Sequence, residues 1–471
     1  MTTIQTEVLV IGSGAGGAVT AALCAEAGRE VTIVEEGAWH TPGDVESFSM
    51  GEMMTRYRNH GLTAALGNPG ISYAEGRCVG GSTEINSGLY RRLPDYLSTA
   101  WATEFRIGDF GPDVLADAAA EVEKFLDITQ VPGEVPPASA KIAEGADALG
   151  WRSTEFARAF SYTPDGRATK QTMARTYIPR AIEAGANLVA DTRIDRLEMR
   201  DGRFRAAVGV STGDGGEEPV RIVADDVFVC GGAVQTPMLL HHSGFRRGIG
   251  SGLRFHPTMK VAARFDSEMD HGEVPMHRIM EFGPHLTIGG SAARRGHVAL
   301  ALADTSLPHE EALADWRNVA VYYAAIRGGG GRVLGLPGLK SPVVFYAMNE
   351  ADMSRLARGM LHLGSALFAA GATELYPGIV GGPILRRQDD LVQWWEAISR
   401  SRANVMTVHL TSTVRMGEDP RRAAADSFGR LRGTENLYVN DASLLPDAPG
   451  VNPQAAIMML ATRNTHAYLA A

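Results

Sequence analysis

EVLVIGSGAGGAVTAALCAEAGREVTIVEEG, residues 7–37, is the stretch that decides the fold of this chain. Its apolar start at 7–11, rich in Val and Ile, predicts a buried parallel strand. Residues 18–27 predict a helix that Gly28 ends, and residues 30–34 predict a second strand. A glycine-rich loop joins the first strand to the helix. The sequence therefore predicts an α/β fold that opens with a Rossmann-like βαβ unit.

The loop of this unit has the spacing of a dinucleotide-binding site. Gly12 allows the sharp turn, Gly14 lets backbone N–H groups reach a pyrophosphate, and Gly17 lets the helix pack closely. The N-terminus of the helix adds partial positive charge beneath the phosphates. An acid follows the second strand, roughly 20 residues further on, where it can hold ribose hydroxyls. The pattern does not separate NAD from FAD. The predicted nucleotide site comprises Gly12, Ser13, Gly14, Ala15, Gly16, Gly17, Glu35 and Glu36.

Composition and charge narrow the class of protein. The chain has 471 residues, a net charge of −9 and three cysteines. The negative charge argues against nucleic acid or an anionic membrane as a partner. The cysteines form no Cys-x-x-Cys pair, so we expect neither a disulfide framework nor a metal site. The start lacks a signal peptide, and no apolar run is long enough to span a bilayer. These features predict a cytoplasmic protein.

The middle of the chain has fewer motifs than its ends. Helices are expected over 113–127, 138–150, 352–370 and 388–399. Residues 187–189 predict a strand, and residues 214–216 a polar hairpin tip. Between 257 and 350, β-like segments such as 259–265, 298–302 and 319–326 predict a mainly antiparallel sheet with one solvated face. Gly328–Gly331 is interpreted as a loop tip.

Two further glycine-containing clusters are typical of ligand-binding loops. In GRCVGGSTEIN, residues 76–86, paired glycines allow the backbone to lie against a flat or charged ligand, and Ser82, Thr83 and Asn86 supply hydrogen-bonding groups. GAVQTPMLLHHSG, residues 232–244, follows the apolar strand 227–230, so it is again a turn from strand to helix. Such turns face the ligand crevice at the carboxyl ends of parallel strands.

The last sixty-odd residues contain a titratable base and a neutral amide on separate elements. His409 precedes an Arg-Met-Gly turn, and Asn452-Pro453 opens an apolar helix. Pro453 is expected to be the first residue of that helix, with Asn452 as its cap. A base paired with an amide suits the removal of a proton from an alcohol.

The three clusters and the C-terminal segment together resemble the glucose–methanol–choline (GMC) oxidoreductase family of flavoproteins. Residues 76–86 are similar to its first signature, Gly-Arg-x-x-Gly-Gly-Ser-Thr-x-x-Asn, and residues 232–244 to its second. Residues 409–416 resemble the His-x-x-Gly-Thr-x-x-Met block, with Ser412 where glycine is usual, and residues 426–441 resemble a further conserved stretch. The resemblance spans residues 7–470.

This resemblance implies FAD rather than NAD as the cofactor, with the adenosine ribose on Glu35. No histidine occurs from 68 to 90, where some relatives attach FAD covalently, so non-covalent FAD is expected. The cofactor-binding residues that the resemblance adds are Arg77, Val79, Gly80, Gly81, Ser82, Thr83, Asn86, Gly232, Asp441, Ala442, Asn452 and Pro453.

The resemblance also implies the reaction: oxidation of an alcohol, with hydride transfer to flavin N5. His409 is the expected general base, and Asn452 is expected to orient the substrate oxygen. The electron acceptor is oxygen or a redox carrier, with the carrier-dependent dehydrogenase favoured. Two alternatives stay open: a flavin-containing lyase or decarboxylase of the same fold, and an NAD-dependent dehydrogenase.

Two parts are expected in the chain. Residues 1–100, 186–256 and 405–471 would form a discontinuous FAD-binding domain, and residues 101–185 and 257–404 a substrate-binding domain. The candidates for lining the substrate pocket, most of which we interpret as ordinary core, are Trp316, Tyr322, Tyr323, Trp394 and Trp395.

Overall fold

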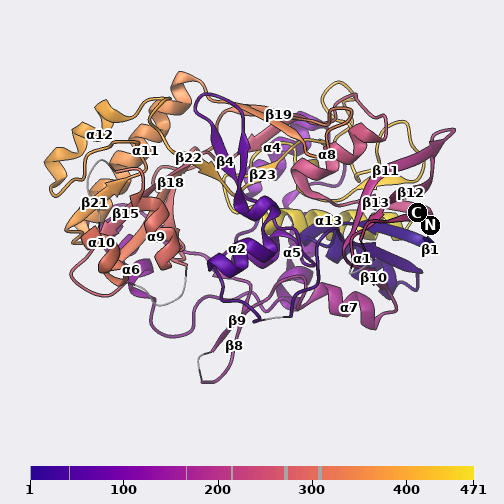
Figure 1. Cartoon of the computed structure of the whole chain (residues 1–471), viewed down its shortest axis with the longest axis horizontal. Coiled ribbons are helices and arrows are strands. Elements are labelled where there is room, and N and C mark those ends of the chain that lie inside the picture. Colours follow the sequence, from indigo (N-terminus) through magenta and orange to yellow (C-terminus); the bar gives the residue numbers. More distant parts are fainter. Residues whose placement is uncertain (1, 42, 166, 214–215, 270–273, 306–309) are drawn as a thin grey trace.

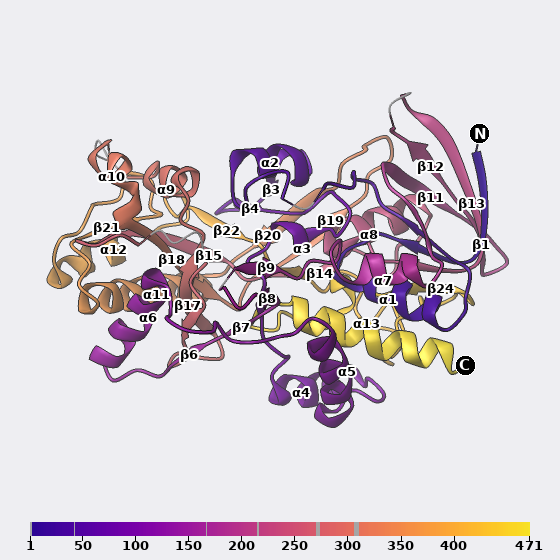
Figure 2. The same cartoon turned by 90° about the horizontal axis from the view of Figure 1, so that it is seen from below.

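The computed structural model describes residues 2–41, 43–165, 167–213, 216–269, 274–305 and 310–471. Two β-sheets organise the chain into two halves that lie side by side along its long axis (Figure 1). Both ends of the chain lie at the far end of the half that contains the βαβ unit (Figure 1), and Figure 2 shows that they are separated there.

The first half is built on a seven-stranded sheet with the order β10-β2-β1-β13-β12-β11, and β24 also pairs with β13. Neighbouring strands among β10, β2, β1, β13 and β24 pair in parallel, whereas β11, β12 and β13 pair antiparallel. The predicted strands at 30–34 and 187–189 are confirmed to within one residue, and the strand predicted at 7–11 is confirmed but begins five residues earlier, at Thr2. Of the predicted hairpin tip at 214–216, residues 214–215 lie outside the described residues. The strands are β1 Thr2–Ile11, β2 Val31–Val34, β10 Asn187–Val189, β11 Thr192–Arg200, β12 Arg203–Ser211, β13 Glu218–Val229 and β24 Leu437–Val439.

Helices from both ends of the chain cover this sheet. The first helix, α1 (Ala15–Glu26), packs against the last, α13 (Gln454–Leu469). Figure 2 shows α13 running from the middle of the molecule to the end where the chain finishes. The other helices of this half are α4 Asp95–Phe105, α5 Pro112–Phe125, α7 Tyr177–Glu183 and α8 Gly232–His242.

The second half is built on a nine-stranded, mainly antiparallel sheet, as the sequence predicts. Its order is β3-β4-β22-β15-β18-β17-β16-β6, and β21 also pairs with β15. The helices α6 (Pro137–Ala148) and α11 (Glu350–Ala369) pack on this sheet through a common apolar core. The strands are β3 Thr63–Ala65, β4 Ile71–Tyr73, β6 Ser153–Glu155, β15 Thr258–Arg264, β16 His277–Ile279, β17 Leu286–Ser291, β18 Val319–Ile326, β21 Glu374–Pro377 and β22 Val405–Thr407.

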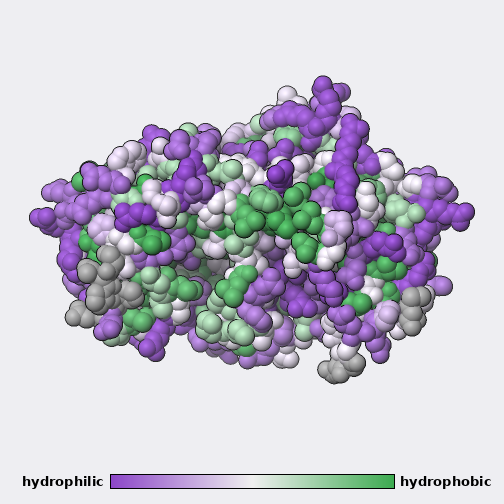
Figure 3. Space-filling view, turned by 45° about the horizontal axis from the view of Figure 1, so that its top comes forward, coloured by the Kyte–Doolittle hydropathy of each residue, from purple (hydrophilic) through white to green (hydrophobic). Residues whose placement is uncertain are grey.

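Short elements connect the two halves. A four-stranded sheet has the order β20-β19-β14-β23. The segment from α2 to β3 carries exposed apolar side chains, Met50, Met54 and Leu62 among them, and Figure 3 shows apolar side chains gathered in the middle of one face. The remaining elements are α2 Met50–Arg56, η1 Arg58–Gly61, α3 Ser82–Ile85, β5 Leu89–Tyr90, β7 Ala157–Arg158, β8 Phe160–Tyr162, β9 Ala168–Lys170, β14 Ser251–Phe255, α9 Arg295–Leu302, α10 Glu310–Ala314, η2 Trp316–Asn318, β19 Gly330–Leu334, β20 Val343–Ala347, η3 Gln388–Leu391, α12 Val392–Ala397, β23 Leu410–Thr411 and η4 Ala442–Leu444.

Two local predictions are wrong. Residues 298–302 are not a β-segment but the end of helix α9, where Val298 and Leu302 are buried on one helical face, four residues apart. A short apolar run does not distinguish a strand from a buried helix. The second half of the Gly328–Gly331 segment is not a loop tip either, because Gly330 and Gly331 begin strand β19 and pair with β20.

The division into two domains stays a prediction, and the packing shows where its boundaries are blurred. Strands β3, β4 and β22 fall within the ranges predicted for the FAD-binding domain but pair into the nine-stranded sheet. Conversely, residues 101–105 of α4 and all of α5 fall in the range predicted for the substrate domain, and the buried apolar residues of both helices belong to the core of the first half.

Candidate active site

A single large cavity runs between the two sheets. Its volume is about 1060 Å³, and residues from both ends of the chain line it. Among the predicted site residues, Gly17, Arg77, Val79 and Gly80 do not line it. Those that do are Gly12, Ser13, Gly14, Ala15, Gly16, Glu35, Glu36, Gly81, Ser82, Thr83, Asn86, Gly232, His409, Asp441, Ala442, Asn452 and Pro453. The structure therefore brings most of the predicted site together.

The three spaced glycines differ in how closely the surrounding chain approaches them. Gly12 has φ +103°, and a Cβ there would lie 2.4 Å from the Cys230 carbonyl oxygen. A Cβ on Gly17 would lie 1.9 Å from the Gly12 carbonyl oxygen, so any side chain would push α1 off the loop. A Cβ on Gly14, in contrast, would meet only the Gly81 Cα, at 4.0 Å, and Gly14 lines the cavity. No side chain caps the N-terminus of α1, which leaves its N–H groups for an anionic ligand.

Glu35 supports the glycine loop from beneath. Its carboxylate accepts hydrogen bonds from Ser13 N–H (3.1 Å), from Ser13 Oγ (2.7 Å) and from Gly37 N–H (3.0 Å). The Ser13 hydroxyl in turn accepts from Gly80 N–H (3.0 Å), so the first signature is tied to the loop. Burial raises the pKa of Glu35 despite these bonds. The neighbouring Glu36 forms an ion pair with Arg58, with Nη2 and Oε2 2.6 Å apart, so its carboxylate is less available to bind a cofactor.

The polar side chains of the first signature hold their own segment in place. Ser82 Oγ accepts from Gly76 N–H, and Thr83 Oγ1 donates to the Gly80 carbonyl. Asn86 Nδ2 donates to Gln454 Oε1 at 2.6 Å, which fastens the signature to the start of α13. The positive φ of Gly80 and Gly81, 94° and 56°, explains the paired glycines.

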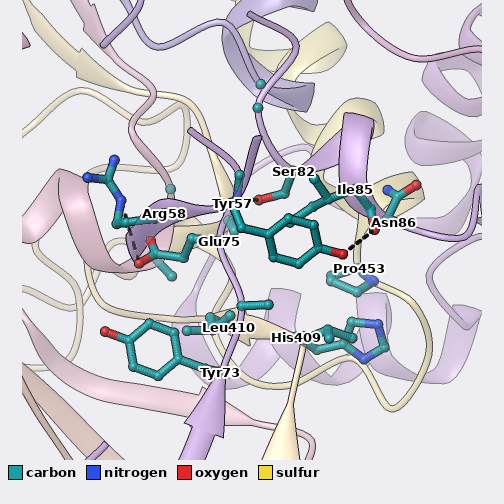
Figure 4. Close-up of a pocket in the computed structure, with 18 of the residues that line it drawn as sticks. Tyr57, Arg58, Tyr73, Glu75, Ser82, Ile85, Asn86, His409, Leu410 and Pro453 are labelled. Atoms are coloured by element: carbon teal, nitrogen blue, oxygen red, sulfur yellow. Dashed lines mark hydrogen bonds and ion pairs between the residues drawn. The ribbon is translucent and has the colours of Figure 1, made fainter. Parts of the chain in front are cut away.

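Sequence motifs did not reveal the wall formed by residues 57–75. Figure 4 shows the Tyr57 ring reaching across the cavity towards Asn86, with its hydroxyl donating to the Ile85 carbonyl at 3.4 Å. Behind it, Arg58 Nε lies 3.9 Å from the buried Glu75 carboxylate. Gln235 also donates to Glu75 at 3.2 Å. This segment lacks glycine-rich spacing, so nothing in the sequence marks it.

Asp441 joins the second signature to the C-terminal segment. Its carboxylate accepts from Gly232 N–H (2.7 Å), Thr236 Oγ1 (2.5 Å) and the Ser443 N–H (2.8 Å). Burial raises the pKa of Asp441, and the hydrogen bonds oppose that shift. The carboxylate thus positions both segments beside the glycine loop.

At the other end of the cavity, three side chains form a line. His409 Nε2 lies 3.3 Å from Asn452 Nδ2, and His409 Nδ1 lies 2.8 Å from His256 Nδ1. Asn452 is therefore not the cap of the last helix. Pro453 occupies that position, without a side-chain cap, and the Asn452 amide is directed at His409 instead. His256 is a residue that the sequence did not reveal.

Hydrogen-bond partners determine which nitrogen of each ring carries a proton. Gly450 N–H donates to His256 Nε2 at 3.0 Å, so a neutral His256 has its proton on Nδ1. That proton is donated to His409 Nδ1, which leaves the proton of a neutral His409 on Nε2. When His409 carries its proton on Nε2, it can donate that proton to the side-chain oxygen of Asn452. When Nε2 is unprotonated, it can accept from the Asn452 amide N–H instead. The orientation of the Asn452 amide therefore depends on the tautomer of His409.

Both rings are neutral near pH 7. Burial, and then the positive charge of Arg278, lower the pKa of His409 to about 4. Burial, and then His409 and Arg327, lower the pKa of His256 well below its usual value. A neutral imidazole can accept a proton, whereas an imidazolium cannot.

Ser412 has an unusual backbone conformation for its residue type. It is fully buried with φ +76°, a region that favours glycine. Its hydroxyl donates to Thr411 Oγ1 at 2.8 Å. This is the position at which the resembled family usually has glycine, a residue that adopts such a conformation without strain.

Among the five aromatic candidates for the substrate pocket, only Tyr323 lines the cavity. Tyr322 and Trp394 are buried in the core, and Trp395 is exposed. Trp316 lies beside a smaller hollow. Within the part of the chain that the structure describes, no helix is both long and apolar enough to cross a membrane, and no group of acids, histidines and cysteines could hold a metal ion.

Comparison with known proteins agrees with this geometry. Sequence models described as GMC oxidoreductase match residues 7–258 and 338–461. A GMC-type oxidoreductase of Sinorhizobium fredii is 38% identical over 99% of this chain and 95% of its own length. A long-chain-alcohol oxidase of Arabidopsis thaliana is 26% identical over 97% of this chain and 66% of its own length.

Solved structures share the fold. The crystal structure of pyridoxine 4-oxidase from Mesorbium loti superposes with a TM-score of 0.75 at 20% identity, covering 98% of this chain and 99% of that one. Formate oxidase superposes with a TM-score of 0.77 at 15% identity, covering 99% and 98%.

Proposed function

The chain belongs to the GMC oxidoreductase family, and on that premise we propose that it oxidises the CH–OH group of a small-molecule alcohol to an aldehyde or ketone. The family binds FAD. The observation that supports the proposal most is the line His256–His409–Asn452 at the end of a cavity that begins at a nucleotide-binding loop.

The residues present fit FAD. The uncapped N-terminus of α1 and the open approach at Gly14 would hold the pyrophosphate, and Glu35 would meet the ribose. When bound, FAD supplies the acceptor for the hydride that leaves the alcohol carbon. We propose that it is bound non-covalently, because Cys78 is buried, does not line the cavity and donates its S–H to the Gly81 carbonyl.

The protein's own part is to hold the alcohol and to receive its proton. The alcohol oxygen would lie between His409 Nε2 and the Asn452 amide, which are close enough to contact one oxygen atom together. To accept the proton, His409 needs a bare Nε2, with its own proton on Nδ1 and donated to His256 Nδ1. In that tautomer His256 carries its proton on Nε2, and the bond from Gly450 N–H is lost. His256 therefore controls when His409 can act as a base.

Oxygen is the acceptor that the relatives favour. The Arabidopsis relative is named an oxidase, as are the matching solved structures, whereas the sequence alone favours a carrier-dependent dehydrogenase. We propose an oxidase that releases hydrogen peroxide. Peroxide formed in proportion to the oxidised alcohol would support this, and turnover only with a quinone or another carrier would contradict it.

The central experiment is anaerobic reduction of the purified yellow protein by a panel of aliphatic, aromatic, sugar, steroid and amino alcohols. We expect at least one class to bleach the flavin, and His409→Gln to slow bleaching by about 10²- to 10⁴-fold with unchanged FAD content. His466→Gln is the matched control, because His466 is exposed and pairs with Glu121 on the surface. A protein without FAD, or unchanged bleaching in His409→Gln, would refute the proposal, and cleavage without net oxidation would indicate a lyase.

A further inference from the structure

One row of the nine-stranded sheet carries two cations. Lys260 on β15 pairs with Tyr323 on β18, Tyr323 pairs with Gly289 on β17, and Gly289 pairs with Arg278 on β16. Residues directly opposite each other on neighbouring strands point to the same face of a sheet. Lys260, Tyr323 and Arg278 all line the cavity, so this row faces the ligand.

Arg278 is buried without a carboxylate partner. Only 1% of its surface is exposed, and its Nη1 donates to the carbonyls of Pro275 (2.8 Å) and His277 (2.7 Å). Among the described residues, neither Nε nor Nη2 has a hydrogen-bond partner and no acid pairs with the guanidinium. Nε is enclosed by the surrounding protein, whereas Arg278 as a residue lines the cavity, so the guanidinium offers a carboxylate its positive charge and the unused Nη2 N–H groups.

Neighbouring residues shape the place that Arg278 occupies. A Cβ on Gly289 would lie 2.3 Å from Arg278 Cδ and 2.7 Å from its Cζ, so only glycine lets the side chain lie along the sheet. The guanidinium carbon lies 5.3 Å from the centre of the Tyr323 ring and 5.6 Å from that of Phe156. The guanidinium is thus held in the cavity wall between two aromatic rings.

Lys260 is the second cation of the row. Lys260 is partly buried, and its ammonium group makes no hydrogen bond or ion pair with any residue that the structure describes. Burial alone lowers the pKa of Lys260 to about 8, so it is still mostly charged at neutral pH. Burying an unpaired charge is costly, and proteins ordinarily pair such groups. Two of them in one row of a ligand cavity indicate that the ligand brings the negative charge.

The cofactor's phosphates do not account for this row. Their predicted place is the N-terminus of α1, on the other sheet, whereas Lys260 and Arg278 are on the sheet of the substrate half. Arg278 is near enough to His409 for its charge to act on that ring. An anion at Arg278 would therefore belong to the same molecule as the alcohol held by His409 and Asn452.

We propose that the substrate is an alcohol that also bears a carboxylate, with the carboxylate bound by Arg278 and Lys260 beside the Tyr323 ring. The alcohol part of this statement rests on the proposed function, whereas the anion site does not. Binding of a carboxylate that has no alcohol group therefore tests the anion site separately from the proposed function.

The binding test uses the FAD-loaded protein and two pairs of probes: benzoate with benzamide, and hexanoate with hexanamide. Each is titrated while the flavin absorption spectrum is recorded. In at least one pair we expect the carboxylate to bind ten times more tightly than its amide, and Arg278→Gln and Lys260→Met each to bring that ratio close to one. Arg278→Lys should keep part of the preference. Arg317→Gln, which removes an exposed cation paired with Glu268, is the matched control and should leave the ratio unchanged.

The turnover test compares 4-(hydroxymethyl)benzoate with 4-(hydroxymethyl)benzamide, and 6-hydroxyhexanoate with its amide. We expect kcat/KM to favour the carboxylate at least tenfold in one pair, with the difference lost in Lys260→Met. That variant keeps the proposal testable if Arg278→Gln fails to fold. Carboxylate binding through Arg278 without oxidation of any alcohol would refute the proposed function and leave the anion site standing. Oxidation of alcohols with no preference between acid and amide in either test would overturn the anion site.

Discussion

The Nδ1 atoms of His256 and His409 face each other at 2.8 Å. Only one of the two can carry a proton, so the rings must hold opposite tautomers. The Asn452 amide can turn about its own bond, whereas the N–H of Gly450 is fixed in the backbone, so Gly450 decides which tautomer the free enzyme holds.

The first prediction concerns these tautomers. In the FAD-loaded protein without substrate, we expect His256 to be protonated on Nδ1 and His409 on Nε2. Nitrogen chemical shifts of protein labelled with ¹⁵N-histidine report this directly, and His256→Phe and His409→Gln assign the signals. In His256→Phe, flavin reduction should slow by less than the roughly 10²–10⁴-fold expected for loss of the base itself. A His409 proton on Nδ1 in the free enzyme would contradict the role given to Gly450.

The second prediction concerns pH. A general base acts only when unprotonated, and the pKa of His409 is lowered to about 4. The rate of flavin reduction at saturating neutral alcohol should therefore be constant above that pKa and fall as the pH drops through about 4. Arg278→Gln removes a positive charge that lowers this pKa, so its acid limb should move upward, towards the usual value of about 6.5.

Stopped-flow reduction measured from pH 3.5 to 8 checks this prediction, and Arg317→Gln serves as the control for loss of a distant charge. A wild-type acid limb near the usual histidine value, or the same limb in wild type and Arg278→Gln, would show that burial and Arg278 do not tune His409.

The third prediction concerns the support of the glycine loop. Ser13→Ala removes the hydroxyl that accepts from Gly80 N–H and donates to Glu35. Leaving such buried groups without a partner costs about 1–3 kcal/mol. Denaturant unfolding of the FAD-free protein should show this loss, together with weaker FAD binding. Ser401→Ala, at an exposed position, should change neither quantity.

The fourth prediction concerns Ser412, with φ +76°. Ser412→Gly and Ser412→Ala lose the same hydroxyl, but only alanine must hold a side chain in the left-handed region. That conformation costs about 1–2 kcal/mol for a residue with a Cβ, so the alanine variant should unfold at lower denaturant concentration than the glycine variant. Equal stability of the two, or a more stable alanine variant, would show that the strain is absent.

The sequence predicts those parts of the site in which the conformation or close packing of the backbone allows only glycine. Gly12 and Gly17 leave no room for a Cβ, so this backbone requires glycine at both positions and the requirement is visible in the sequence. His409 and Asn452 are predicted because the sequence around each of them resembles the family's motifs. Asn452 nevertheless has a different role from the predicted cap, because its amide is held by a residue 43 positions away.

The parts that the sequence did not predict depend on how distant strands align. The row Lys260–Tyr323–Gly289–Arg278, of which the sequence predicts only Tyr323, takes one residue from each of four strands, and its members have no common spacing along the chain. His256 was missed for the same reason, because its partners His409 and Gly450 are far from it along the chain. Register between strands is set by the packing of whole faces, and a shift of one residue would turn these side chains to the other side of the sheet.

Helix α13 has a consequence for how the protein is made. It packs on α1, directly behind the glycine loop, and its first residues close the active-site end of the cavity. The nucleotide loop is therefore synthesised more than 400 residues before the helix that braces it. Domains ordinarily fold from the N-terminus during synthesis, but here the cofactor site has to wait for residues 454–469. Chains stalled before Gln454 should bind no FAD, so synthesis of this helix becomes the step that commits the enzyme to its cofactor.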